Sequence, residues 1–291
     1  MKKFGIDISE WQAGFDFDKA LSEGVEFVIL RGADALYKDK CFEGFYEACK
    51  SRNIPVGVYH YARSTTPEAA RQEAQFLIEN VLSGKQFSYP IYMDVESANQ
   101  KKVGKKQLTD AVIAYCEELK QAGYLPGVYT SLSFLKSYLD DARLAPYEKW
   151  IAQWYRYCEY GGDLGMWQFG GETNMIRSNK VAGVTCDQNY CYLDYPAIIQ
   201  NRKLNGHKDD EQKKGDFTVE MRVLKKGCKG DDVRALQLLL IGNGWSGGTW
   251  GADGNFGAET EAAVLAYQHK HGLQKDGKAG PETMSCILGI A

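Results

Sequence analysis

Two acidic residues that follow an apolar run have the spacing of a catalytic pair. The run covers residues 89–93, and Asp94 and Glu96 come directly after it, separated only by Val95. Side chains alternate along a β-strand, so the two carboxyl groups would share one face with their Cα atoms about 6–7 Å apart. Such a pair can perform acid/base chemistry. The alternative is a solvated strand end, because Asp-x-Glu is a common tripeptide.

Two further acidic residues occupy comparable positions. Asp7 lies at the end of the strand-like residues 4–8, and Asp187 follows the strand-like residues 181–185. If these strand ends meet, four carboxyl groups repel one another, so at least one should have the raised pKa that a general acid needs near neutral pH. Sugar rings can pack on the aromatic residues near the same strand ends, although each could instead belong to the core. They are Trp11, Tyr59, Tyr61, Tyr129, Trp154 and Trp167.

The elements that must position these residues alternate along the first 200 residues. Strand-like runs at 4–8, 26–30, 55–61, 89–93 and 127–129 alternate with amphipathic runs at 16–22, 42–51, 67–81, 108–121 and 132–138, and further strand-like runs follow at 149–154, 166–169 and 181–185. Eight strands with five helices predict an α/β fold, a modified TIM-like barrel rather than an open doubly wound sheet. Active sites of such barrels lie at the carboxyl ends of the strands, so the acidic residues would meet at one mouth.

The composition is that of a soluble globular protein, with 44% hydrophobic residues in a chain of 291. The formal net charge of -3 gives no basic surface for nucleic acid or for a membrane, so neither is expected as a partner. No segment approaches the roughly 20 apolar residues that span a bilayer, and the first residues lack the apolar core of a signal peptide. The eight cysteines lack paired C-x-x-C spacing and are expected to be mostly free thiols.

The chain is predicted to divide near residue 200. Residues 201–216 hold one large apolar residue among mixed charges, which indicates a linker between a domain at 1–200 and a second at 217–291. The second segment repeats the pattern D-G-x-x-G-x-E-T at 253–260 and 276–283, and each copy has the turn and capping residues that begin a helix. Together with the helical apolar spacing of residues 233–240, the repeats predict a small C-terminal three-helix domain, suited to binding rather than catalysis.

The first 200 residues resemble glycoside hydrolase family 25, the N-acetylmuramidases (lysozymes) of the Chalaropsis type. The resemblance rests on six ordered motifs: GIDISEWQ at 5–12, GVYHYA at 57–62, MDVE at 93–96, GVYT at 127–130, MWQF at 166–169 and Asp187. It implies a (β/α)₅β₃ barrel that cleaves the β-1,4 bond between N-acetylmuramic acid and N-acetylglucosamine in peptidoglycan.

The resemblance also implies roles for single residues. Glu96 would be the general acid/base, Asp94 its partner, and Asp7 and Asp187 would shape the charge of the site. We expect the substrate to be bound by Tyr61, Tyr129, Trp154 and Gln168, and we expect neither a cofactor nor a metal.

The role of Asp94 is open on sequence alone. A separation of about 5–5.5 Å between the two carboxyl groups favours a protein nucleophile, whereas about 6.5–9.5 Å favours inversion. In a third route, which the resemblance suggests, the 2-acetamido group of the substrate attacks the anomeric carbon. Asp94 would then orient this group, and Glu96 would protonate the leaving oxygen.

Residues 217–291 resemble the small peptidoglycan-binding domain of cell-wall hydrolases, through Gly227, residues 231–237, both repeats and residues 267–273. A wall-degrading activity without a visible signal peptide predicts an endolysin of a phage or prophage, made in the cytoplasm and acting on the cell wall after release by a holin or by lysis. One alternative is an inactive wall-binding protein, which the presence of all four carboxylates disfavours. Another is an amidase or peptidase, which would need a zinc-binding His/Cys set or a Cys-His pair, and neither has recognisable spacing.

Overall fold

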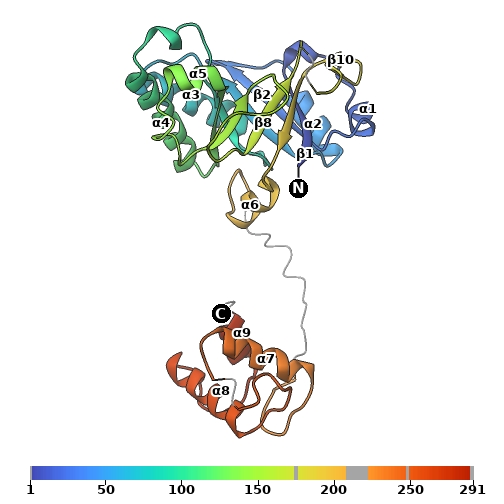
Figure 1. The fold of residues 1–291 in the computed structure, drawn as a ribbon, viewed down its shortest axis with the longest axis vertical. Helices are drawn as coiled ribbons and strands as arrows, with labels where there is room; N and C mark the ends of the chain where they lie inside the picture. Colours follow the sequence, from blue (N-terminus) through green and yellow to red (C-terminus); the bar gives the residue numbers. More distant parts are fainter. Residues whose placement is uncertain (1, 174–175, 208–221, 247–248, 289–291) are drawn as a thin grey trace. The chain divides into compact units, whose positions relative to one another are not determined.

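The computed structural model describes residues 2–173, 176–207, 222–246 and 249–288 of the chain (Figure 1). The chain divides into two compact units, Met1–Asp209 and Asp210–Ala291. The first contains a β-barrel surrounded by helices, and the described part of the second contains three helices (Figure 1). Among the described helices, none is both long enough and apolar enough to cross a membrane.

Eight strands of the first unit close into a barrel. Seven of them are parallel and follow one another in sequence around the barrel, and the eighth, β11, runs antiparallel between β8 and β1. Pairing of β1 with β2 closes the ring, and β3 (Tyr37–Lys38) extends β2 as a short hairpin. This architecture confirms the predicted modified TIM-like (β/α)₅β₃ barrel. The barrel strands are β1 (Lys3–Ile8), β2 (Phe27–Asp34), β4 (Val56–Tyr61), β5 (Ile91–Asp94), β6 (Pro126–Ser131), β7 (Glu148–Ala152), β8 (Met166–Gly170) and β11 (Asp187–Cys191).

Five helices connect the first six barrel strands and cover the outside of the sheet (Figure 1). Three of them begin at a side chain that accepts a hydrogen bond from the first turn, namely Asp16, Thr66 and Ser131. Such caps satisfy backbone N–H groups that have no partner inside the helix. The helices are α1 (Phe17–Ser22), α2 (Phe42–Ser51), α3 (Pro67–Leu77), α4 (Lys105–Gln121) and α5 (Leu132–Tyr138), with the shorter turns η1 (Glu10–Gln12), η2 (Ile78–Leu82) and η3 (Gln100–Lys102).

Large aromatic side chains fill the interior of the barrel. Phe27, Tyr92 and Trp150 are buried together in one apolar cluster. Gly127 makes room for this packing, because a Cβ atom there would overlap the ring of Tyr92. Tyr195 joins the same cluster from α6 (Tyr195–Asn201), which follows β11 and lies at the end of the barrel near the N-terminus (Figure 1). The interior is therefore a packed core, and only its opposite end is available for a site.

The eighth barrel strand is not the one that the sequence predicts. Residues 181–185 were expected to form it, but they make a separate hairpin of β9 (Lys180–Val181) and β10 (Val184–Thr185), which turns through Ala182 and Gly183 at positive φ. The barrel is completed by β11, which begins with Asp187. Because β11 is antiparallel, its first residue lies beside the carboxyl ends of the other strands. Asp187 therefore begins the last strand instead of following it, yet it still reaches the mouth.

The first part of the predicted linker belongs to the barrel unit. Asn205 is fully buried, its Oδ1 accepts from the backbone N–H of Leu125 at 2.7 Å, and its Nδ2 donates to the carbonyl of Tyr89 at 2.7 Å. The prediction that a linker begins at residue 201 is therefore wrong for residues 201–207. One buried amide with satisfied hydrogen bonds anchors a segment that has little apolar surface of its own. Residues 208–216 of the predicted linker lie outside the described residues.

The described part of the second unit is a three-helix domain, as predicted. Its helices are α7 (Asp231–Gly242), α8 (Ala258–Lys270) and α9 (Pro281–Leu288). Their apolar faces form one core that includes Val233, Leu236, Leu240, Val264 and Tyr267. The apolar spacing read from the sequence therefore identified the buried side of the first two helices.

The two sequence repeats have the same hydrogen bonds. Gln237 of α7 donates from Nε2 to Asp253, to the Asn255 carbonyl and to Thr260, and its amide oxygen accepts from the Gly254 N–H. Gln268 of α8 makes the equivalent bonds one repeat later, to Asp276, the Lys278 carbonyl, Thr283 and the Gly277 N–H. Each repeat is thus a turn fixed by the helix before it, which is the architectural role that the sequence indicates.

Candidate active site

The barrel mouth brings together the four acidic residues that the sequence singles out. Asp7 of β1 and Asp187 of β11 are paired residues of neighbouring antiparallel strands. Asp94 ends β5, and Glu96 lies two residues beyond it. Burial raises the pKa of Asp7, Asp94 and Asp187, and the charge of Glu96 raises each of these pKa values further, so groups from three strands act on one another. The four acidic residues therefore meet at the carboxyl ends of the parallel strands, as expected for this barrel.

All four carboxyl groups have a raised pKa, chiefly because surrounding protein replaces water. The pKa of Asp7 is raised to about 6 and that of Asp187 to about 8. Asp94 lies well above its ordinary pKa, first through burial and then through the charges of Glu96 and Asp7. Glu96 is exposed to solvent on one side, yet neighbouring atoms still raise its pKa, while the charge of Lys101 lowers it. The prediction of at least one raised pKa in this group is confirmed.

Asp7 accepts two amide hydrogen bonds on a single oxygen. Its Oδ2 is 3.1 Å from Nε2 of Gln168 on β8 and 2.7 Å from Nδ2 of Asn189 on β11. Both bonds lower the pKa of Asp7 below the value that burial alone would give. Asn189 was not among the predicted site residues. Its signal in the sequence is its position two residues after Asp187, which places both side chains on one face of a strand.

Asp94 has the opposite environment. It is 3% exposed, and its Oδ1 has no hydrogen-bond partner among the described residues. Strand register places it level with Tyr61 on β4 and Tyr129 on β6. A buried polar atom without a partner is costly in a folded protein and needs an explanation.

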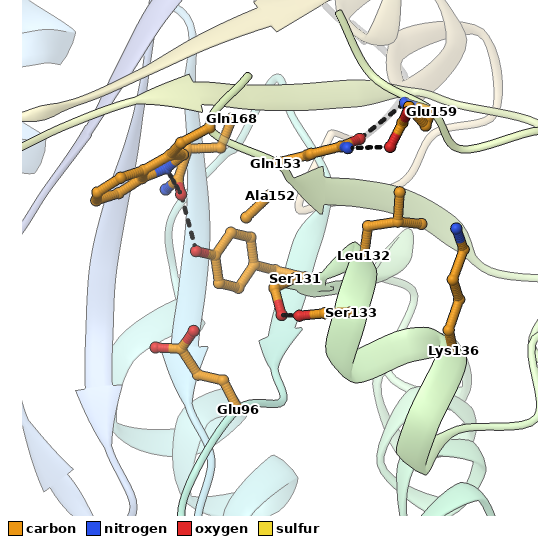
Figure 2. A pocket seen from close by; sticks show the side chains of 11 residues that line it. Glu96, Ser131, Leu132, Ser133, Lys136, Ala152, Gln153, Glu159 and Gln168 are labelled. Carbon is orange, nitrogen blue, oxygen red and sulfur yellow. Dashed lines mark hydrogen bonds between the residues drawn. The ribbon is translucent and has the colours of Figure 1, made fainter. Parts of the chain in front are cut away.

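Glu96 borders a cavity of about 560 Å³ beside the acidic cluster (Figure 2). This volume is typical of pockets that bind small ligands. In Figure 2, Glu96 stands apart from Ser131, Leu132, Ser133 and Lys136, which line the cavity from the end of β6 and from α5. The remaining lining residues are Tyr129, Ala152, Gln153, Trp154, Glu159 and Gln168. Of the four acidic residues of the mouth, Glu96 alone lines this cavity.

Three of the four predicted substrate-binding residues line the same cavity. Trp154 is 38% exposed, whereas Tyr129 and Gln168 are almost fully buried in its wall. The Tyr129 hydroxyl and the Trp154 indole N–H both donate to Oε1 of Gln168, at 2.9 and 3.1 Å. The fourth, Tyr61, ends β4 outside this cavity, and the guanidinium of Arg63 lies 5.4 Å from its ring. The polar atoms of Tyr129, Trp154 and Gln168 therefore contact one another, so these residues offer a ligand chiefly the ring surfaces of Tyr129 and Trp154.

Several other residues with catalytic side chains belong to the scaffold. His60 is buried between the Tyr115 hydroxyl and the Ala35 carbonyl, and burial lowers its pKa to about 4. Arg31 is paired with Glu10 and Asp39. All eight cysteines are free thiols. Within the described ranges, no group of three or more His, Cys, Asp or Glu side chains could hold a metal ion.

Comparison with known protein families gives two matches. Residues 6–176 match the sequence model of the glycosyl hydrolases family 25, which is more than half of the chain. Residues 229–287 match the model described as a peptidoglycan binding domain. The two matches fall on the two compact units that the structure separates.

Individual proteins with a similar sequence include a lysozyme and an amidase. The autolytic lysozyme of Clostridium acetobutylicum is 28% identical over 292 residues, which covers 98% of this chain and 79% of that protein. The N-acetylmuramoyl-L-alanine amidase CwlL of Bacillus licheniformis is 46% identical over 68 residues, only 23% of this chain and 19% of the amidase. The likeness to the amidase is thus confined to a small module, whereas the likeness to the lysozyme covers both units.

Among solved structures, the CTP1L endolysin is similar to this chain with a TM-score of 0.57 and 25% identity. The aligned part covers 69% of each chain. The modular autolysin LytC of Streptococcus pneumoniae aligns with a TM-score of 0.56 and 25% identity, over 66% of this chain and 47% of that one. Both alignments have a TM-score above 0.5, so this chain is similar in fold to an endolysin and to an autolysin.

Proposed function

This chain belongs to the glycosyl hydrolases family 25, and from that membership we propose how its own residues cleave the glycan of the bacterial cell wall. The protein is a glycoside hydrolase of the lysozyme type that acts on peptidoglycan, and it carries a peptidoglycan-binding domain. We assign the β-1,4 bond between N-acetylmuramic acid and N-acetylglucosamine as the bond cleaved, because the lysozyme of Clostridium acetobutylicum is similar over nearly the whole chain.

Glu96 is proposed as the general acid and base. The observation that carries this assignment is its position: it lines the cavity of about 560 Å³, while Asp7 and Asp94 are buried behind it. Its pKa is raised by its surroundings, which keeps a carboxyl group protonated closer to neutral pH. Glu96 can therefore give its proton to the leaving glycosidic oxygen and later take a proton from the attacking water.

Asp94 is proposed to orient the 2-acetamido group of the sugar whose anomeric carbon reacts. Its buried Oδ1 has no partner in the described part of the protein, and the substrate amide N–H would supply one. The acetamido oxygen then attacks the anomeric carbon as the bond to the leaving oxygen breaks and Glu96 donates its proton. A water molecule then attacks the anomeric carbon and opens the resulting oxazolinium ring. The Glu96 carboxylate takes a proton from that water as it attacks. A nucleophilic Asp94 and direct inversion are the alternatives.

Replacing Glu96 with Gln tests the assignment of the acid. We expect Glu96→Gln to lower kcat by about 10³-fold or more on purified walls, since the amide cannot donate the required proton. Glu159→Gln is the matched control, because Glu159 lines the same cavity but is bonded to Gln153. Release of new reducing ends is the readout. Near-normal release by Glu96→Gln would rule out this role.

Two substrates separate the possible roles of Asp94. NMR of the first product distinguishes inversion from the two retaining routes. A glycan whose acetamido groups have been removed then distinguishes the retaining routes, because only a nucleophilic Asp94 could still cleave it. We expect retention, together with loss of cleavage on the deacetylated glycan. Cleavage of that glycan at an undiminished rate would overturn the orienting role.

The second unit is proposed to hold the enzyme on the wall, and the whole protein to reach the wall when the cell that makes it is lysed. The likeness to the CTP1L endolysin supports an enzyme of this type. Fractionation of producing cells before and after lysis tests the proposal. Protein found outside intact cells would contradict it.

A further inference from the structure

Two buried amide groups next to Asp7 are fixed in orientation by neighbouring donors. The Gln168 amide oxygen accepts from the Tyr129 hydroxyl at 2.9 Å and from the Trp154 indole N–H at 3.1 Å. The Asn189 amide oxygen accepts from the Trp150 indole N–H at 2.8 Å. An indole N–H can only donate, so it binds the oxygen end of an amide and never the NH₂ end. The NH₂ group of each amide is therefore directed at Asp7.

A fixed amide discriminates between the two protonation states of its neighbour. A free amide could turn and present its carbonyl oxygen to a protonated carboxyl group, so it would serve either state. An amide held with NH₂ forward can only donate, and donation favours the ionised carboxylate. Both amides act on the same oxygen of Asp7, at 3.1 and 2.7 Å.

We propose that Gln168 and Asn189 are positioning residues that hold Asp7 as the ionised carboxylate of the site, and that Tyr129, Trp154 and Trp150 act through them. The inference rests on the proposed function, because it assigns a task within that reaction. An ionised Asp7 places a fixed negative charge behind Gln168 of the cavity wall, and such a charge stabilises the positive charge of an oxocarbenium-like transition state. Tyr129 and Trp154 also line the substrate cavity, so the same two side chains present ring surface to the sugar and hold the amide behind them.

The pKa values of the groups around Asp7 are consistent with a negative charge on Asp7. The pKa of Asp7 is raised to about 6 and that of Asp187 to about 8, chiefly by burial, and burial also raises the pKa of Asp94. The charge of Asp7 is itself one reason why the pKa values of Asp94 and Asp187 are raised. The titratable groups that face Asp7 are Glu96 and Asp94 from the end of β5, Tyr59 from β4, Tyr129 from β6, and Cys186 and Asp187 at the start of β11.

The test compares variants that remove a donor to Asp7, or the donor that fixes one, without changing any carboxyl group. Gln168→Met keeps the length of the side chain but removes the N–H, and Tyr129→Phe removes only a hydroxyl. Either change raises the pKa of Asp7, so the acid limb of the kcat/KM profile moves to higher pH, by about one unit for Gln168→Met and less for Tyr129→Phe. Tyr147→Phe is the control, because its hydroxyl donates to Glu117, away from the site.

A second measurement does not depend on catalytic activity. Carbon-13 NMR of the aspartate carboxyl groups follows the titration of Asp7 in the intact protein, with Asp7→Asn used for assignment. We expect the same upward shift of the Asp7 midpoint in Gln168→Met and Tyr129→Phe, and none in Tyr147→Phe. Unchanged midpoints in folded Tyr129→Phe and Gln168→Met would overturn the inference, even if both had lost activity at every pH. Lack of activity in the unaltered protein would instead refute the proposed function and leave the NMR result decisive for Asp7.

Discussion

The protonation of Glu96 is set by two opposing influences. Neighbouring protein atoms raise its pKa, and the positive charge of Lys101, five residues after Glu96 in the chain, lowers it. A general acid must be protonated before the reaction begins, so its pKa marks the upper pH limit of activity. Lys101 therefore lowers that limit.

Replacing Lys101 with Met should extend activity to higher pH. Loss of the cation raises the pKa of Glu96, so the basic limb of kcat/KM moves upward, by about a few tenths of a pH unit for an exposed charge. The effect should be measured at low ionic strength, because salt screens it. Lys102→Met is the matched control, since the Lys102 ammonium binds the Asn99 side chain. A downward shift, or equal shifts in both variants, would contradict this role of Lys101.

Single residues show how far the sequence identifies the site. Asp94 and Glu96 could be found because strand spacing and the end of an apolar run are local properties. The contact of Asn189 with Asp7 depends on the pairing of residues 182 positions apart, which no local pattern contains. Gln168 is predicted to bind the substrate. Its three hydrogen bonds, with Asp7, Tyr129 and Trp154, depend on the placement of β1, β6 and β8 around one barrel, which the sequence does not show.

At the level of elements, β11 shows why the last part of the barrel resists prediction. The alternation of strands and helices identified the first seven barrel strands, because each has an apolar run. β11 has polar residues facing the site, Asp187 and Asn189, and the apolar run before it forms a hairpin outside the barrel. Because polar residues of the site occupy these positions, β11 lacks the apolar run by which the other barrel strands were predicted. Its reversed direction also brings two polar residues to a mouth otherwise built from the ends of parallel strands.

The closed end of the barrel depends on Asn205. We expect Asn205→Ala to lower the free energy of unfolding of the barrel unit by about 2–4 kcal/mol, because the Leu125 N–H and the Tyr89 carbonyl lose a buried partner. Urea denaturation followed by tryptophan fluorescence measures this change. Asn99→Ala, at an exposed position, should stay within about 0.5 kcal/mol. Equal stability of the two variants would show that Asn205 does not anchor the segment.

At the level of the whole molecule, two units divide the work between cleavage and attachment. The sequence predicts both from separate signals, strand-end acids in one and a repeated turn pattern in the other. It misplaces the boundary, because residues 201–207 look like a linker by composition while Asn205 is buried against the barrel. Composition reports how much apolar surface a segment can bury, and it misses a single well-bonded amide.

Removing residues 210–291 should separate the two activities. We expect the shortened chain to cleave soluble glycan fragments at an unchanged rate, because the site lies within the barrel unit. Its activity on intact walls should fall about tenfold or more, since the second unit no longer raises the local concentration of enzyme at the wall. Sedimentation with purified walls measures binding, and full-length Glu96→Gln serves as a binding-competent control. Equal sedimentation of the shortened and full-length chains would contradict a wall-binding role.

The identity of the sugar at the newly formed reducing end tests the central claim most directly. Purified peptidoglycan is digested with the intact protein, reduced with borohydride and hydrolysed, so that each new reducing end is recovered as a sugar alcohol. An N-acetylmuramidase gives muramicitol, and Glu96→Gln gives none. Glucosaminitol in its place, or new free amino groups without any sugar alcohol, would contradict the assignment of the bond and of the catalytic residues.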